Sequence, residues 1–90
     1  SGSTVDLVAS NYQRPGYGFA GWSIKQLDPD AANFKTELAA AVSRGEVFGP
    51  NETITTTNDF YNYAISEGNT IYVNLYAVWV KLLLTLYFLL

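Results

Sequence analysis

Cysteine and histidine are both absent from the 90 residues of this chain. The absence of cysteine excludes disulfides, and the absence of both residues removes the usual ligands of a structural zinc ion. Small domains often need such cross-links, because a chain of this length buries only about 60–65% of the surface that its unfolded form exposes. An apolar core must therefore supply the stability of the fold, and we expect no metal and no cofactor.

Positive charge is also scarce, since five Lys and Arg residues stand against eight Asp and Glu, and the net charge is −3. The basic residues are spread along the chain, at Arg14, Lys25, Lys35, Arg44 and Lys81. DNA and RNA are bound by clusters of such side chains, which neutralise the phosphates. The sequence therefore predicts no nucleic-acid partner.

Side chains that could catalyse a reaction are few. A nucleophilic Ser or Thr needs a base beside it, most often His, and no Ser lies three residues before a Lys. The acidic residues are scattered, and Asp28 and Asp30 are better explained as the start of a helix than as a catalytic pair or a calcium site. We therefore expect that the protein is not an enzyme.

Apolar and aromatic residues are abundant, at 49% and 16% of the chain, including seven Tyr and two Trp. Each large aromatic side chain buries about 150–250 Å² on folding, so a few of them can fill a small core. Length and composition together predict one domain over residues 4–80, and Ser1-Gly2-Ser3 resembles the remnant of a cleaved expression tag.

The N-terminal part of the chain combines two strand signals with a loop. Residues 4–9 are short, β-branched and apolar, as in a strand, and Pro15-Gly16 marks the loop that follows. Residues 17–23 place aromatic side chains at alternating positions, until Trp22 falls one residue out of step after Gly21. Because a glycine inside a strand often marks a bulge, we predict a bulged strand here.

The clearest helix signal spans Asp28–Arg44. Asp28 suits the N-cap, and Pro29 suits the first helical position, where its missing N–H leaves no hydrogen bond unmade. Gly45 follows as a left-handed C-terminal cap. Five apolar side chains recur at helical spacing and form one stripe: Ala31, Phe34, Leu38, Ala41 and Val42. We expect this stripe to pack against a sheet.

The rest of the domain is rich in strand signals. Residues 47–51 predict a turn, residues 53–57 a partly exposed strand, and Glu67-Gly68-Asn69 the turn of a hairpin. Residues 70–80 are apolar on both faces, which predicts a central strand that is covered on both sides. One helix on an antiparallel or mixed sheet of four to five strands is an α+β fold.

The last ten residues, 81–90, are almost all hydrophobic. Residues 71–90 have nearly the length of a membrane span, but Lys81 would then lie at its middle, which costs about 2.5–3.5 kcal/mol. We prefer a strand at Leu82–Leu90 that pairs with the sheet, either within one chain or by exchange between two chains, which would give a homodimer. A membrane-proximal domain whose tail begins an anchor is the alternative.

Three aromatic side chains close together form the best candidate for a ligand surface: Phe60, Tyr61 and Tyr63. An aromatic ring with a polar tip suits a half-wet surface, where it can stack on a sugar. The simpler explanation is that one or two of these rings point into the core and that the others lie on a sheet face. A carbohydrate-binding module is kept as an alternative on this basis.

Two motifs resemble a known family of bacterial repeats. Residues 14–23 (RPGYGFAGWS) resemble the signature R-x-G-Y-x-F-x-G-W of the Listeria–Bacteroides repeat, also called the internalin B-type repeat. Residues 75–79 (LYAVW) resemble its closing L-Y-A-x-W, and residues 47–55 look like its turn and short strand. The matching residues, which are structural in the family, are Gly16, Tyr17, Phe19, Gly21, Trp22, Leu75, Tyr76 and Trp79.

The resemblance implies a β-grasp-like module of bacterial surface or secreted proteins, outside the cell, used in adhesion or spacing. Its partners would be a protein or glycan ligand on another cell, or neighbouring repeats. It implies a core built from motif residues, namely Tyr17, Phe19, Trp22, Leu75 and Trp79, and it transfers no catalytic or binding residue. The chain departs from the family pattern in having one strand fewer before Arg14 and a longer segment between Ser23 and Leu75.

Overall fold

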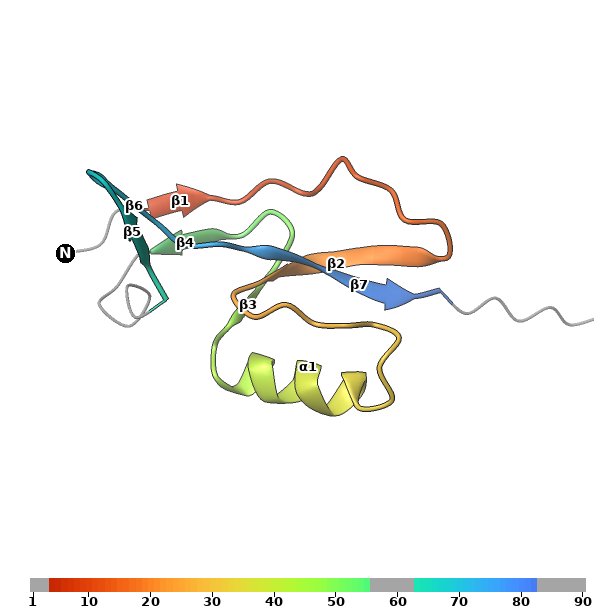
Figure 1. Ribbon diagram of the computed structural model, residues 1–90. Helices are drawn as coiled ribbons and strands as arrows, with labels where there is room; N and C mark the ends of the chain where they lie inside the picture. The colour runs from red at the N-terminus through yellow and green to blue at the C-terminus, as the bar shows by residue number, and fades with distance from the viewer. Residues whose placement is uncertain (1–3, 56–62, 83–90) are drawn as a thin grey trace, which may run out of the picture.

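The computed structural model describes residues 4–55 and 63–82 of the chain. In these residues one helix and seven short strands form three antiparallel sheets, so the expected α+β class is confirmed (Figure 1). The elements are β1 (Thr4–Asp6), β2 (Tyr17–Ser23), α1 (Phe34–Ser43), β3 (Val47–Phe48), β4 (Thr53–Thr55), β5 (Ile65–Glu67), β6 (Thr70–Tyr72) and β7 (Tyr76–Lys81). The expectation of one sheet of four to five strands is wrong for this part of the chain, because β1 pairs with β4, β5 with β6, and β2 with both β3 and β7.

The centre of the largest sheet is β2, which lies between β3 and β7. We expected residues 70–80 to form a single central strand, and this is wrong. Residues 70–72 pair with β5 as β6, residues 76–81 pair with β2 as β7, and the segment between them belongs to neither ladder. The apolar residues of this stretch are therefore divided between two sheets. Ile71 on β6 remains 64% exposed.

The predicted bulge in β2 is confirmed. The register between β2 and β7 shifts between Phe19 and Gly21, and Gly21 has a φ of 150°. A Cβ atom on Gly21 would lie 2.3 Å from the carbonyl oxygen of Phe48, so only glycine allows β3 to approach this closely. The extra residue also brings Phe19 and Trp22, three positions apart, to the same face of the sheet, with ring centroids 5.1 Å apart.

The start of the helix was predicted too early, because α1 begins at Phe34 and not at Asp28. The Asp28 carboxylate accepts a hydrogen bond from the Asp30 amide at 2.9 Å, and the Asp28 carbonyl accepts one from the Ala31 amide at 3.2 Å. Asp28 therefore closes a tight turn, which is the other common use of an aspartate before a proline. The predicted end is confirmed, since α1 stops before Arg44 and Gly45 has a φ of 73°.

The helix packs on the face of the β2–β7 pair that carries Val78 and Val80. Ala41 is completely buried, and Phe34 and Leu38 are half-buried and line a groove with Val80. Val42 is 56% exposed, so the predicted stripe is wrong at this position. The reason is geometric, because neighbouring helical residues point about 100° apart and the sheet can take only one of them.

The core of the described residues is small. Its buried apolar side chains are Leu27, Ala41, Ile54 and Val78, and Ser23 and Glu46 are buried with them. The motif residues expected in the core (Tyr17, Phe19, Trp22, Leu75, Trp79) are only half-buried. This expectation is corrected for the aromatic residues of β2 and β7, since their rings lie on the face of the sheet that α1 does not cover.

The remaining strands gather at one end of the molecule (Figure 1). The β5–β6 hairpin turns at Gly68, whose φ is 59°, as predicted. In β4 only Ile54 is buried, between two exposed threonines, and the last two residues of the strand expected at 53–57 lie outside the described residues. Residues 47–51, expected as a turn, instead form β3 followed by a turn.

Candidate functional site

The aromatic side chains of the two motifs meet on one face of the β2–β7 pair. Residues directly opposite each other in an antiparallel pair share a face. The opposed pairs on this face are Tyr17 with Lys81, Phe19 with Trp79, and Trp22 with Ala77. The rings of Phe19 and Trp79 meet edge to face, with centroids 5.7 Å apart and planes at 66°.

A loop from β1 to β2 runs along this aromatic face, on the side of the sheet away from α1 (Figure 1). The Trp22 indole N–H donates a hydrogen bond to the Val8 carbonyl at 3.2 Å. The Ala9 amide donates to the Asn51 side-chain oxygen, and the Tyr12 amide donates to the Ser10 hydroxyl, both at 3.0 Å. The first two bonds tie the start of the loop to β2 and to the turn after β3, and the third lies within the loop.

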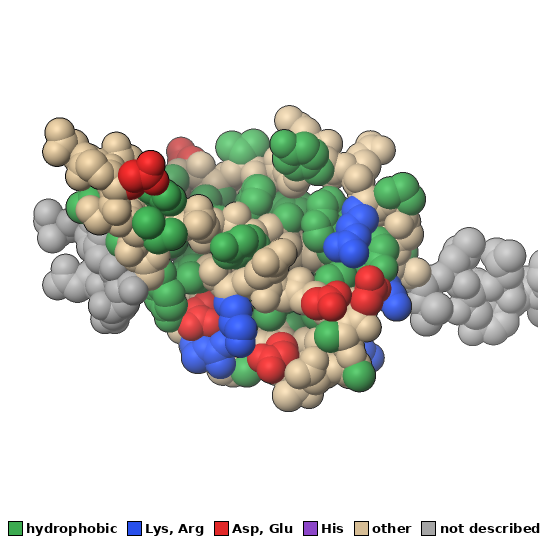
Figure 2. All heavy atoms as spheres, viewed as in Figure 1, with side chains coloured by type: hydrophobic (Ala, Val, Ile, Leu, Met, Phe, Trp, Pro, Cys, Tyr) green, Lys and Arg blue, Asp and Glu red, His purple; other side chains and the backbone are tan. Residues whose placement is uncertain are grey.

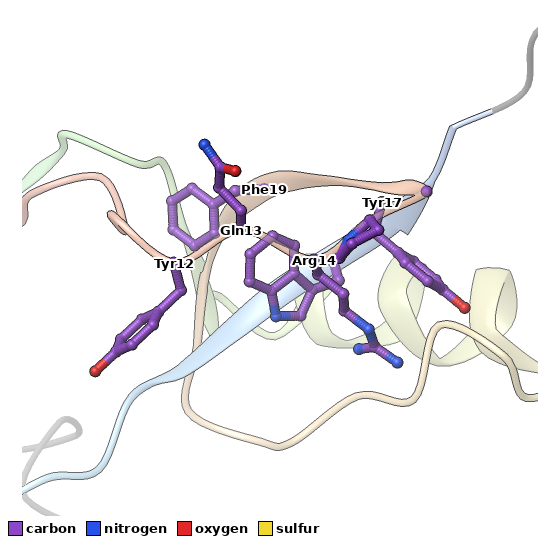
Figure 3. Close-up of a pocket in the computed structure, with 8 residues that line it drawn as sticks. Tyr12, Gln13, Arg14, Tyr17 and Phe19 are labelled. Atoms are coloured by element: carbon purple, nitrogen blue, oxygen red, sulfur yellow. The ribbon is translucent and has the colours of Figure 1, made fainter.

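The end of this loop forms one wall of a cleft of about 480 Å³, shown in Figure 3. Its floor is formed by Phe19 and Trp79 from the paired strands, and Tyr12 at its rim is 83% exposed. The cleft is lined by Tyr12, Gln13, Arg14, Pro15, Gly16, Tyr17, Phe19 and Trp79. Three aromatic types and two long polar side chains therefore share one concave surface, which is the usual make-up of a small-ligand site.

The Arg14 side chain is fixed beside the cleft by two contacts. Its guanidinium group lies 4.2 Å from the centre of the Tyr17 ring, a cation–π contact, and 3.6 Å from the Asp30 carboxylate. The Tyr17 hydroxyl donates a hydrogen bond to the same carboxylate, and Lys81 Nζ lies 3.4 Å from it. Asp30, in the turn before α1, thus ties the helix side of the domain to β2 and β7.

These contacts shift the pKa values of both Asp30 and Tyr17. The pKa of the Asp30 carboxyl is lowered, chiefly because the Tyr17 hydroxyl donates to it and also because Lys81 and Arg14 lie close. The pKa of the Tyr17 hydroxyl is raised, chiefly because the hydrogen bond to Asp30 holds its proton. At neutral pH Asp30 is therefore charged and Tyr17 is neutral, as their hydrogen bond requires.

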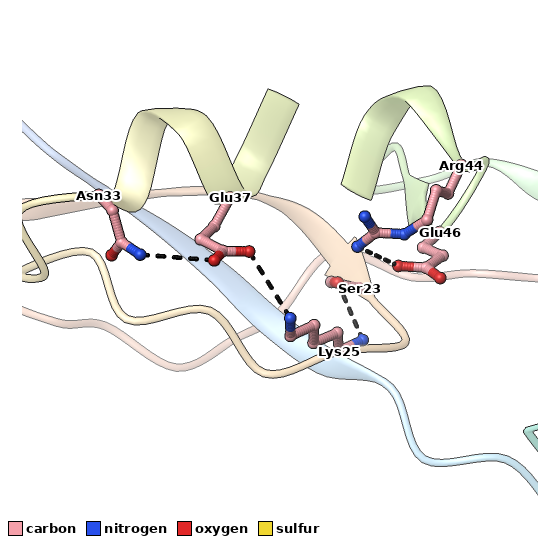
Figure 4. A network of polar contacts seen from close by, with 6 residues as sticks. All are labelled: Ser23, Lys25, Asn33, Glu37, Arg44 and Glu46. Atoms are coloured by element: carbon pink, nitrogen blue, oxygen red, sulfur yellow. Dashed lines mark hydrogen bonds and ion pairs between the residues drawn. The ribbon is translucent and has the colours of Figure 1, made fainter. Parts of the chain in front are cut away.

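A second polar cluster lies where α1 ends (Figure 4). The buried Glu46 carboxylate accepts hydrogen bonds from Arg44 at 2.9 Å and from the Tyr63 hydroxyl at 2.8 Å. These donors, Arg44 first, lower the pKa of Glu46 although burial opposes them. On the helix itself, Glu37 lies 3.6 Å from Lys25 Nζ. The cluster joins α1 and the turn after it to residues 25 and 63, and contains no cleft residue.

The structure describes only one of the three residues of the ligand surface predicted from the sequence, and that residue belongs to this second cluster. Tyr63 is 43% exposed, but its hydroxyl is held by Glu46, while Phe60 and Tyr61 lie outside the described residues. The structural motif residues lie on β2, on β7 or next to the ends of these strands. Sequence reasoning missed Tyr12 as a surface residue. The only signal for it was an aromatic residue in a loop, outside any alternating pattern.

The charges on the described surface are mixed. On the face seen in Figure 2, acidic and basic side chains lie next to one another instead of gathering by sign. No group of three His, Cys, Asp or Glu side chains within residues 4–55 and 63–82 is arranged to hold a metal ion. In the same residues, no helix has the length and apolar character needed to cross a membrane.

Comparisons with models of protein families, with curated protein sequences and with solved structures found no match to this chain.

Proposed function

We propose that the chain is a non-catalytic adhesion or spacer module of a bacterial surface or secreted protein, with a β-grasp-like arrangement of its helix and sheet. One observation carries the proposal. The two segments that resemble the bacterial repeat, residues 14–23 and 75–79, come together as the paired strands β2 and β7 and their ends. Their aromatic residues contact one another across the pair, through Phe19 and Trp79.

This pairing offers a physical reason for the two motifs to occur together. Each of the two segments is too short to cover its own aromatic rings, and the rings of one segment pack against those of the other. Gly21 fits the same view, because the close approach of β3 leaves no room for a side chain at this position. The contacts of Phe19, Trp79 and Gly21 support a structural role for these matched residues in the largest sheet.

Two carboxylates of the described residues support a non-catalytic role. A general acid or base works best when its pKa lies near the working pH, and a buried carboxyl can be tuned upward to reach it. The pKa values of Asp30 and Glu46 are shifted the other way, downward, by their hydrogen-bond donors. Both carboxylates are therefore suited to stay charged in ion pairs and not to transfer protons.

Display of the chain on the surface of a non-adherent bacterium tests this proposal. In one strain the chain is the outermost domain, and in a second strain it lies beneath a known binding domain. An adhesion module raises attachment of the first strain to cells or glycan-coated surfaces, and a spacer raises attachment of the second. The proposal is wrong if neither strain gains attachment, or if the purified chain turns over a substrate and a single substitution abolishes that turnover.

A further inference from the structure

We infer that the cleft between the β1–β2 loop and the β2–β7 pair is the ligand site of the module, and that its ligand is a neutral oligosaccharide. The inference rests on the proposed adhesion function, because it names the ligand class and the site of that function. Six side chains would make the contacts: Tyr12, Gln13, Arg14, Tyr17, Phe19 and Trp79. The volume of about 480 Å³ lies within the range of about 300–1,000 Å³ that is usual for ligand sites.

Tyr12 is an exposed aromatic residue that lines the cleft. It is 83% exposed, more than any other large apolar or aromatic residue described, yet its backbone is fixed by the hydrogen bond to Ser10. A ring this exposed adds nothing to the core of this domain. It offers instead an apolar face with only two side-chain torsions to order, on which the C–H face of a sugar ring can stack.

Arg14 supplies directed hydrogen-bond donors. Its guanidinium plane is held over the Tyr17 ring and beside Asp30, while 40% of the side chain remains exposed. A planar donor group that is already oriented loses little freedom on binding and can reach two adjacent hydroxyl groups at once. Gln13, at the next position of the loop, adds an amide that both donates and accepts.

The charge balance of the cleft favours a neutral ligand. Arg14 is the one charged residue that lines the cleft, and its guanidinium group is paired with Asp30. Lys81, the nearest further cation, pairs with the same carboxylate. Arg14 and Lys81 together carry one positive charge more than Asp30, but an anionic ligand would have to compete with Asp30 for Arg14, and it would approach a chain whose net charge is −3.

A proline-rich peptide is the main competitor for an aromatic cleft. Proline residues lack an N–H, so such a peptide would leave the amide oxygen of Gln13 with few donors. Sugar hydroxyl groups donate and accept, which matches Arg14 and Gln13 together.

The test is binding of the purified full chain to neutral oligosaccharides of glucose, galactose, mannose, xylose and N-acetylglucosamine at millimolar concentrations. Nuclear magnetic resonance follows the two indole N–H signals, and calorimetry gives the affinity. We expect the Trp79 signal to move on binding more than the Trp22 signal, whose N–H already donates to Val8. Tyr12→Ala should weaken binding at least about tenfold, as for a central aromatic contact.

Two further variants distinguish binding at the cleft from non-specific effects of a substitution. Arg14→Lys keeps the charge but removes the planar fork, so it should also weaken binding. Tyr72→Ala is the matched control, because it removes an exposed tyrosine from β6, outside the cleft, and should leave affinity unchanged. Melting curves of each variant show whether the fold is kept.

Three results would overturn the inference: no neutral oligosaccharide binds, binding is insensitive to Tyr12→Ala and Arg14→Lys, or only anionic glycans or proline-rich peptides bind at the cleft. Each of these leaves the adhesion proposal standing if the displayed chain still promotes attachment. Conversely, oligosaccharide binding in solution without attachment of displaying cells would refute the adhesion proposal and keep the ligand site.

Discussion

Phe19 and Trp79 face each other across β2 and β7, edge to face at 5.7 Å, although they come from opposite ends of the domain sequence. Their contact closes the loop that contains α1, β3, β4 and the β5–β6 hairpin. Contacts between such distant segments form only after the entropy of loop closure has been overcome. The ring pair therefore reports directly on whether the chain adopts this topology.

The first prediction concerns this ring pair. In a double-mutant cycle, Phe19→Leu and Trp79→Leu should show a coupling of about 0.5–1.5 kcal/mol in the free energy of unfolding, measured with urea. Phe19→Leu combined with Ile71→Ala is the control, since Ile71 lies on another sheet, and this pair should be additive within about 0.3–0.5 kcal/mol. Additivity in both cycles would mean that the rings do not meet.

The second prediction concerns the bulge. Gly21→Ala should cost about 3 kcal/mol or more, because the new Cβ would lie 2.3 Å from the Phe48 carbonyl oxygen. Gly68→Ala is the control. Gly68 has a φ of 59° and open space around it, so only the backbone strain of about 1 kcal/mol should be measured. Equal losses in the two variants would contradict the close approach of β3.

The third prediction tests which side of α1 is buried. Ala41→Leu adds three carbons at a position that is 0% exposed, so overpacking should destabilise the fold by about 1–3 kcal/mol. Ala39→Leu makes the same change on the exposed side of the helix and should change stability by less than about 0.5 kcal/mol. Urea denaturation of both variants gives the comparison, and the reverse order of effects would show that the helix is rotated.

The fourth prediction is a loss of stability in acid. The folded-state pKa of Glu46 lies below its ordinary value, which is about 4.3 in an unfolded chain. Its contribution is therefore fully present above about pH 4.3 and is lost as the pH falls through the folded-state pKa. Glu46→Gln should be less stable than the wild type at pH 7, and the difference should shrink below pH 4.3. Denaturation at a series of pH values measures this, and a constant difference would contradict the shift.

Glycine positions made the local structure of this chain predictable. The bulge at Gly21, the helix end at Gly45 and the hairpin at Gly68 all follow from the freedom of one residue type, and all three are found. The helix start could not be fixed in the same way. Asp28 followed by proline suits a helix N-terminus and a tight turn equally well, and packing farther along the chain decides between them.

The packing itself was harder to predict. Ala41 and Val42 are both apolar neighbours in the sequence, and only the placement of α1 on the sheet buries the first and exposes the second. The aromatic cleft depends on contacts between residues far apart in the chain, since the Tyr12 loop meets Trp79 only after β2 and β7 have paired. No local pattern in the sequence encodes that meeting.

The central claim is that this chain presents a binding surface and that the cleft at Tyr12 is that surface. The most direct measurement is the attachment of displaying bacteria to glycan-coated surfaces under flow, with the wild-type chain, Tyr12→Ala and Tyr72→Ala at equal surface expression. The account predicts attachment for the wild type and Tyr72→Ala, and its loss for Tyr12→Ala. Equal attachment of all three, or attachment of none, would contradict it.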